Sequence, residues 1–166
     1  GMPKSIPAEG TLFADTQRFS RGTTREEIIV KLAADQKKLV EEIWARRAPD
    51  LPVKDVNEFV TLASIVEKET GQADERSRVA SVFINRLNKG MRLQSDPTII
   101  YGIFGGKGKP ADRPILRSDI DKPTPYNTYI IDALPPGPIA NPGRASIEAA
   151  ANPARTKELY FVADGT

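Results

Sequence analysis

The sequence contains no cysteine and no histidine among its 166 residues. The first absence excludes disulfides and thiolate zinc sites, and the second excludes Ser-His-Asp triads, Cys-His pairs and imidazole ligands for a metal. Catalytic chemistry is therefore left to carboxylates, lysine, tyrosine, serine and threonine. The residues imply no metal site and no organic cofactor.

Long apolar runs and clustered charge are also missing. The longest apolar runs are a few residues, far below the roughly 20 that a membrane-spanning helix requires. No segment has the pattern of a signal peptide, and Gly1 before Met2 resembles the remnant of an affinity tag. The 24 Lys and Arg residues are scattered among 22 Asp and Glu, whereas a nucleic-acid-binding protein usually carries a basic patch. Nucleic acid is therefore not an expected partner.

What is present is the composition of a globular domain, with 39% hydrophobic and 28% charged residues. The length favours a single domain. Residues 1–22 carry proline, glycine and short aromatic-containing runs, so we predict an extended lead-in there and the domain itself over residues 23–166. Three helices are predicted: from Thr23 or Thr24 to about Arg47, from Asp55 to about Thr70, and from about Asp74 to Asn88.

Local signals mark the ends of these helices. Asp55 with Glu58 three residues later resembles a capping box. Gly71 and Gly90 stand where a C′ glycine usually ends a helix. The first helix is instead ended by Pro49 and Pro52.

The second half of the chain has a different character. Residues 121–143 contain six prolines, which excludes a regular helix over that stretch. The remaining predictions are a short helix beginning at Asp96-Pro97-Thr98, a mobile glycine-rich loop over Gly102–Pro110, a brief helix over Ser146–Ala151 and a strand over Leu159–Val162. These elements predict an α+β fold with central helices and a smaller strand-containing part.

Two acids, Glu67 and Glu69, lie near the C-terminal end of the second predicted helix. The carbonyls and the negative end of the helix dipole make this an unfavourable place for negative charge, so a carboxyl group there should be easier to protonate. A helical wheel at about 100° per residue places the two acids on opposite sides of the apolar stripe. The structural alternative is a pair of solvated boundary glutamates, and the pattern alone does not choose between the acids.

Two further polar segments could carry chemistry. The first is the turn Gly90–Thr98, whose structural alternative is a helix end followed by an N-cap at Ser95 or Asp96. The second is Pro125–Tyr129, where two tyrosines and an amide offer the flat apolar surface and hydrogen-bonding groups of a sugar-binding cleft. The structural alternative is that these tyrosines anchor a long loop on the core.

Taken together, these segments resemble the endolytic murein transglycosylase family, also called YceG-like. The resemblance covers most of the chain in ordered blocks. They are Leu62–Thr70, Val79–Leu87, Met91–Thr98, Tyr126–Tyr129, Leu134–Ala140 and Leu159–Gly165.

The resemblance implies a lytic-transglycosylase-like active site. Glu69-Thr70 resembles the Glu-Ser pair of the wider group, Gln94 its loop glutamine, and Tyr126-Asn127 its Tyr-Asn motif. By this match Glu69 is the catalytic acid and then base, with Glu67 as a neighbour that modulates it. Gln94, Tyr126 and Asn127 are expected to bind substrate.

Arg86 is expected to bind a peptide-stem carboxylate, with an ion pair to a nearby acid as its structural alternative.

The implied reaction cleaves the bond between N-acetylmuramic acid (MurNAc) and N-acetylglucosamine (GlcNAc) inside a glycan strand. The C6 hydroxyl of the muramic residue attacks its own C1, which leaves a 1,6-anhydro end without using water. Because the nucleophile is intramolecular, one carboxyl group suffices where ordinary glycosidases pair two. Burial should raise the pKa of Glu69 so that it is protonated on arrival.

The resemblance also implies a cellular setting. The partners would be peptidoglycan strands and cell-wall synthesis proteins. The parent protein would have a single membrane anchor in the inner membrane and act on its extracytoplasmic, periplasmic face. Relative to full-length members, residues 23–166 would be a catalytic domain truncated at both ends.

Three other readings remain open. A non-catalytic peptidoglycan-binding module would bind glycan through the tyrosine-rich loop and leave no anhydro ends. A pyridoxal-phosphate-dependent aminodeoxychorismate lyase would need a Schiff-base lysine and a phosphate-binding cup, and the Gly102–Lys109 segment lacks the strand–loop–helix pattern of such a cup. A structural domain without activity is the third.

Overall fold

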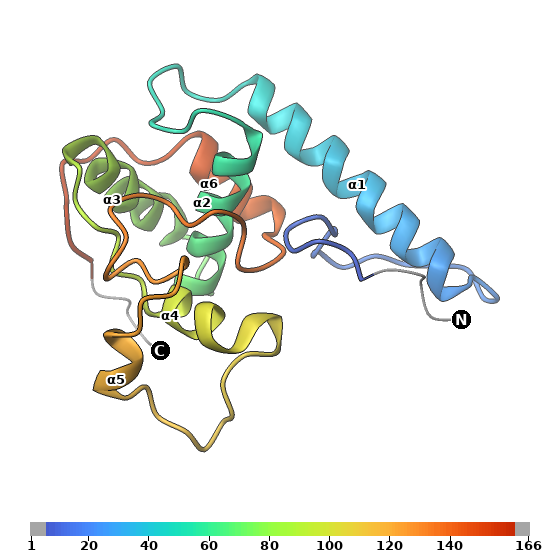
Figure 1. Ribbon diagram of the computed structural model, residues 1–166. Coiled ribbons are helices and arrows are strands. Elements are labelled where there is room, and N and C mark those ends of the chain that lie inside the picture. Colours follow the sequence, from blue (N-terminus) through green and yellow to red (C-terminus); the bar gives the residue numbers. More distant parts are fainter. Residues whose placement is uncertain (1–5, 162–166) are drawn as a thin grey trace.

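A computed structural model describes residues 6–161, and within them every regular element is helical (Figure 1). The helices are α1 (Arg25–Ala45), α2 (Val56–Glu69), α3 (Arg76–Lys89), α4 (Asp96–Phe104), α5 (Arg117–Ile120) and α6 (Arg144–Ala151), with a single 3₁₀ turn at Gly105–Lys107. No helix in this described range combines the length and the apolar character needed to cross a membrane.

The predicted α+β class is wrong, because the described residues contain no strand. Leu159–Phe161, the described part of the expected strand, instead lie against α3, and Val162 lies outside the described residues. Asn85 donates a hydrogen bond to the carbonyl of Glu158 (2.9 Å), and Arg86 donates one to the carbonyl of Leu159 (2.7 Å). Strand propensity reports a fit to a half-buried surface, and here a helix supplies that surface.

The predicted starts of α1 and α2 are confirmed by their caps, whereas α3, predicted from about Asp74, begins at Arg76 without a side-chain capping bond. Thr24 accepts a hydrogen bond from the amide of Glu27 (3.1 Å), and Asp55 accepts one from the amide of Glu58 (2.9 Å). In the predicted capping box of Asp55 and Glu58, the Glu58 carboxylate would accept from the amide of Asp55. It accepts instead from the amide one residue earlier, that of Lys54 (3.1 Å). Each of these bonds satisfies an amide that the first helical turn leaves without a partner.

The predicted ends of α1, α2 and α3 lie within two residues of the observed ends, but a glycine cap is confirmed in one case only. Gly90 ends α3 in the left-handed conformation, with φ 71°. Gly71 does not take up that conformation, because Thr70 ends α2 in an extended conformation with φ −144°. α2 therefore stops abruptly, and the chain turns away directly after Glu69.

The core is built around α2, which contacts α1, α3, α4 and α6. Figure 1 shows α2 at the centre, with α6 beside it although some 80 positions separate them in the sequence, and with α1 extending to one side. Eight consecutive α2 residues, 59–66, are buried, as in a helix that is surrounded by protein. Phe59, Leu62 and Ile65 are fully buried, and each contributes about 1.5–3 kcal/mol to folding.

Irregular segments complete the molecule. The proline-rich stretch after α5 contains turns and no helix until α6, as predicted. The expected loop over Gly102–Pro110 is partly wrong, because α4 extends to Phe104 and the 3₁₀ turn follows. Residues 6–22 contain turns and no regular element, and they pack onto the body, since Gly10 donates to the Asn141 side chain (2.8 Å) and Phe13 donates to the carbonyl of Leu32 (3.0 Å).

Candidate active site

The abrupt end of α2 separates the two glutamates that the helical pattern could not distinguish. The Glu67 carboxylate accepts a hydrogen bond from the amide of Gly143 (2.6 Å), which starts α6, and lies 3.8 Å from the Arg76 guanidinium. Glu69 faces another way, and its Oε2 accepts a hydrogen bond from the hydroxyl of Ser95 (2.8 Å). Glu67 is therefore engaged in holding α6 against α2, while Glu69 faces a cavity.

The cavity at Glu69 has a volume of about 300 Å³. Its walls come from five parts of the chain: the end of α2, α3, the turn at the start of α4, the loop after α5 and the last described residues. It is lined by Glu69, Arg86, Leu93, Gln94, Asp96, Tyr129, Tyr160 and Phe161. A site of this kind combines one candidate acid with apolar, amide and aromatic groups, as ligand pockets commonly do.

The environment of Glu69 raises the pKa of its carboxyl group. Burial is the main cause, and the negative charge of Asp96 adds to it, while the hydrogen bond from Ser95 opposes both. The protonated form consequently persists to higher pH than in a solvated glutamate. This is the property required of a group that must donate a proton near neutral pH.

A buried hydroxyl network fixes Ser95. Its amide donates to the Thr128 hydroxyl (2.8 Å), and its carbonyl accepts from the Thr98 hydroxyl (2.6 Å). The Thr98 and Thr128 hydroxyls lie 2.8 Å apart, and all three side chains are buried. Ser95 occupies the N-cap position of α4 but makes no side-chain capping bond. Its hydroxyl is instead committed to Glu69.

Asp96 and Tyr129 form a second pair on the wall of the cavity. The Tyr129 hydroxyl donates to Asp96 Oδ1 at 2.5 Å. Burial and then this carboxylate raise the pKa of Tyr129, so the phenol stays protonated. The Asp96 charge lies in the first turn of α4, where the helix dipole stabilises it.

Gln94 lies in the turn between these groups, in a strained conformation. It is the one described residue other than glycine with a positive φ, 53°. Its amide donates to the carbonyl of Thr128 (3.2 Å), and its exposed side chain makes no hydrogen bond to other described residues. Such conformations cost about 1–3 kcal/mol and cluster at functional sites. The side-chain amide of Gln94 is therefore available to a ligand in the cavity.

Arg86 supports the wall of the cavity that the last described residues form. Its buried guanidinium donates to the carbonyls of Leu159 (2.7 Å), Arg92 (3.0 Å) and Leu93 (3.2 Å). The Tyr160 ring lies over it, with 4.9 Å between the guanidinium carbon and the ring centroid. Tyr160 is 71% exposed. Arg86 therefore holds an exposed aromatic ring at the mouth of the cavity, and it forms no ion pair with an acid among residues 6–161.

The structure does not bring Tyr126 and Asn127 into this cavity. Asn127 is buried, and its amide nitrogen donates to the carbonyls of Ile120 and Lys122, both at 2.8 Å. Tyr126 packs on Tyr101 with 4.8 Å between ring centroids and lines another cavity. The geometry thus places Tyr129, from the same motif, beside Glu69. The described residues contain no cluster of three metal-binding carboxylates.

The sequence signature of the YceG-like family matches residues 2–166. The chain belongs to the YceG-like family. The resemblance predicted from the motifs is therefore confirmed.

Named relatives of this YceG-like chain share about 40% of its sequence. It is 41% identical over 157 residues to an endolytic murein transglycosylase of Bacillus subtilis strain 168, which is 95% of this chain and 42% of the relative. It is 39% identical over 161 residues to one of Streptococcus pneumoniae strain D39, covering 95% of this chain and 28% of the relative.

A crystal structure of a yceG-like protein from Listeria monocytogenes superposes with a TM-score of 0.76 at 36% identity. The alignment covers 98% of this chain and 52% of that protein. The YceG-like chain therefore spans between about a quarter and a half of the relatives that it matches.

Four residues of the site escaped the sequence reasoning. The sequence indicates Ser95 and Asp96 only as helix caps, Tyr129 only as part of a motif and Tyr160 only as part of a strand. Their common signal is that each lies inside a block that carries the family resemblance. What the sequence did not show is which side chains of those blocks share a cavity with Glu69.

Proposed function

We propose that this YceG-like chain is the catalytic region of an endolytic lytic transglycosylase that cleaves the MurNAc–GlcNAc bond within peptidoglycan strands. The observation that supports it best is a single half-buried carboxyl group, Glu69, whose pKa is raised in a cavity lined by polar and aromatic side chains. The names of the Bacillus and Streptococcus relatives support murein as the substrate.

Glu69 acts first as the acid. Ser95 donates to Oε2, so Oε1 carries the proton that passes to the glycosidic oxygen. The bond from that oxygen to C1 of MurNAc breaks, and GlcNAc leaves with the proton. The carboxylate left on Glu69 stabilises the positive charge that develops at C1.

Glu69 then acts as the base. It takes the proton of the C6 hydroxyl as O6 bonds to C1, which closes the 1,6-anhydro ring and restores the protonated acid. No water is consumed, so the second carboxylate of an ordinary glycosidase is not required. Asp96 serves a different purpose, since its charge favours the protonated form of Glu69 and its oxygen holds Tyr129.

The remaining polar and aromatic groups of the cavity bind the glycan. Gln94 offers a side-chain amide, without a hydrogen-bond partner among residues 6–161, for the sugar hydroxyl and acetamido groups. Tyr160 offers a flat exposed face on which a pyranose ring can stack. Tyr126 and Asn127 were predicted for this role from the motif, and their part in binding remains a prediction.

The proposal extends to the cellular setting. We expect the parent protein to be anchored in the cell membrane, with this chain on the extracytoplasmic face alongside cell-wall synthesis proteins. The extent of the catalytic domain, residues 23–166, also remains a prediction.

A digestion in H₂¹⁸O tests the reaction class. Purified peptidoglycan is incubated with the chain in labelled water, and the new ends are analysed by mass spectrometry. We expect 1,6-anhydroMurNAc ends without ¹⁸O. Reducing ends labelled with ¹⁸O would instead identify a hydrolase, in which Asp96 activates water. Glycan binding without new ends would favour the binding-module alternative.

A further inference from the structure

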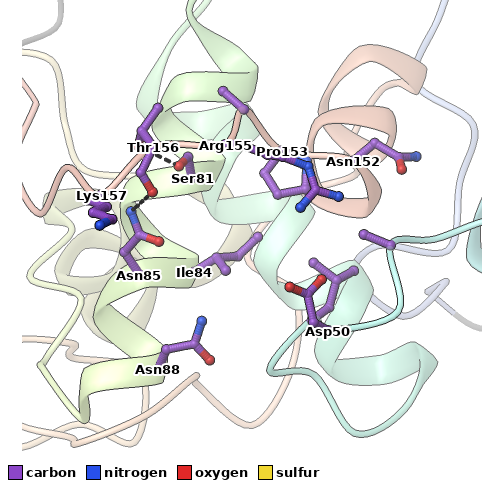
Figure 2. Close-up of a pocket in the computed structure, with 13 residues that line it drawn as sticks. Asp50, Ser81, Ile84, Asn85, Asn88, Asn152, Pro153, Arg155, Thr156 and Lys157 are labelled. Carbon is purple, nitrogen blue, oxygen red and sulfur yellow. Dashed lines mark hydrogen bonds between the residues drawn. The ribbon is translucent and has the colours of Figure 1, made fainter.

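A second cavity, of about 450 Å³, lies on another side of α3 (Figure 2). It is enclosed by α3, by the turn after α1 near Asp50 and by residues 152–157. On α3 it is lined by Ser81, Asn85 and Asn88, which recur at spacings of four and three and so share one face of the helix. None of the residues discussed for the transglycosylase reaction lines it.

The cavity presents polar groups that have no partner. Within the described part of the chain, the side chains of Asp50, Asn88, Asn152, Arg155 and Lys157 form no hydrogen bond or ion pair. They comprise two cations, one carboxylate and two amides. Figure 2 shows the Arg155 guanidinium and the Asp50 carboxylate on the same side of the space, with Asn85 and Asn88 across from them along α3.

The segment that carries the two cations is fixed in place. The Thr156 hydroxyl lies 2.7 Å from that of Ser81, and Asn85 donates to the carbonyl of Thr156 at 3.0 Å. Arg155 and Lys157 flank this anchored residue, so their positions are set before a ligand arrives. A ligand consequently binds without the cost of ordering this backbone.

The same segment connects this cavity to the Glu69 site. Three residues beyond Lys157 the chain reaches Tyr160, which lines the Glu69 cavity. Three residues span at most roughly 10 Å of extended chain. A short chain attached to a sugar at Glu69 therefore extends far enough to enter the second cavity.

The chemistry of the lining selects the class of ligand. No aromatic side chain lines the cavity, so a sugar ring has no flat surface on which to stack. A simple anion such as phosphate would be repelled by Asp50. Two cations, one carboxylate and several amides instead match a short peptide that bears carboxylates and a free amine.

We propose that this cavity binds the peptide stem attached to the muramic residues of peptidoglycan. Arg155 and Lys157 pair with the stem carboxylates, Asp50 pairs with its free amine, and Asn88 and Asn152 bond to its peptide groups. The inference rests on the proposed function. It also gives the stem a place other than Arg86, whose partners among residues 6–161 are backbone carbonyls and an aromatic ring.

Direct binding of a synthetic stem tests this assignment. The tetrapeptide N-acetyl-L-Ala–γ-D-Glu–L-Lys–D-Ala, whose one free amine is that of lysine, is titrated into the chain and followed by NMR or calorimetry. We expect saturable binding that the Arg155→Ala/Lys157→Ala double variant weakens about tenfold or more, because charge-assisted bonds are lost. Arg21→Ala removes an equally exposed arginine outside the cavity and should leave the affinity unchanged.

The charge pattern provides a second test. Asp50→Asn should weaken binding of the tetrapeptide but not of the same peptide acetylated on its lysine amine. Absence of saturable binding, or equal affinities of wild type and double variant, would overturn the proposal. Peptide binding does not need Glu69, so Glu69→Gln should bind the peptide normally. A failed stem site and a failed transglycosylase assignment therefore give different results.

Discussion

At the scale of single residues, Glu67 and Glu69 show why the pattern of a helix does not define a catalytic group. Both lie in the last turn of α2, and the helical pattern alone left them equivalent. The structure distinguishes them by their contacts, because Glu67 accepts the amide of Gly143 and Glu69 accepts the hydroxyl of Ser95. The raised pKa belongs to the second, since burial and Asp96 both disfavour its charge.

The first prediction concerns Asp96→Asn. Removing this charge lowers the pKa of Glu69, because one cause of its elevation is lost. The reaction needs protonated Glu69, so the alkaline limb of kcat/KM against pH should move to lower pH. An unchanged alkaline limb would show that Asp96 does not act on the catalytic acid.

Ser95→Ala should shift the same limb the other way. The hydrogen bond from Ser95 lowers the pKa of Glu69, so its loss raises that pKa. The rate at the optimum should also fall, by about tenfold to a hundredfold, because the orientation of the carboxyl group is lost. NMR titration of the Glu69 carboxyl carbon measures the first effect apart from the second. A downward shift in pKa would contradict the assignment.

Tyr160 provides a test of glycan stacking. Tyr160→Ala removes an exposed ring at the mouth of the cavity and should raise KM about tenfold, which corresponds to roughly 1.4 kcal/mol. Tyr160→Phe keeps the ring and should retain a KM near that of the wild type. If Phe and Ala variants are equally impaired, the hydroxyl and not the ring face is the important group.

At the scale of elements, capping residues predicted helix starts well and helix ends less well. Thr24 and Asp55 each make the expected bond because an N-cap needs only local geometry. Gly71 failed because Thr70 already ends α2 in an extended conformation. The strand at Leu159–Val162 failed for a different reason, since the carbonyl of Leu159 accepts a hydrogen bond from Arg86 of α3 and Phe161 packs on Phe83 of the same helix. No local pattern reveals which surface a segment will meet.

The packing of the N-terminal segment leads to a matched pair of substitutions. Gly10 and Gly22 both have a positive φ, 84° and 91°, which disfavours alanine by about 1–2 kcal/mol. An added Cβ at Gly10 would lie 2.7 Å from Pro138, whereas at Gly22 it meets nothing within 4 Å. Gly10→Ala should therefore cost about 1–3 kcal/mol more than Gly22→Ala. Urea unfolding measures both, and equal costs would show that the segment does not need this close contact.

At the scale of the whole molecule, the site is assembled by contacts between distant positions. Ser95 lies 26 residues from Glu69, Tyr129 lies 33 from Asp96, and Leu159 lies 73 from Arg86. Periodicity and capping residues predict secondary-structure elements but not these long-range contacts. The family resemblance brought Glu69, Gln94 and Arg86 to one site, yet it also suggested Tyr126, which lies at another cavity.

The central claim is that Glu69 is the acid and base of a lytic cleavage, and a pair of glutamate variants tests it most directly. Peptidoglycan is digested with wild type, Glu69→Gln and Glu67→Gln, and 1,6-anhydroMurNAc ends are counted by mass spectrometry. We predict that wild type and Glu67→Gln form these ends and that Glu69→Gln forms about a hundredfold to ten-thousandfold fewer. Anhydro ends formed by Glu69→Gln at the wild-type rate would contradict the account.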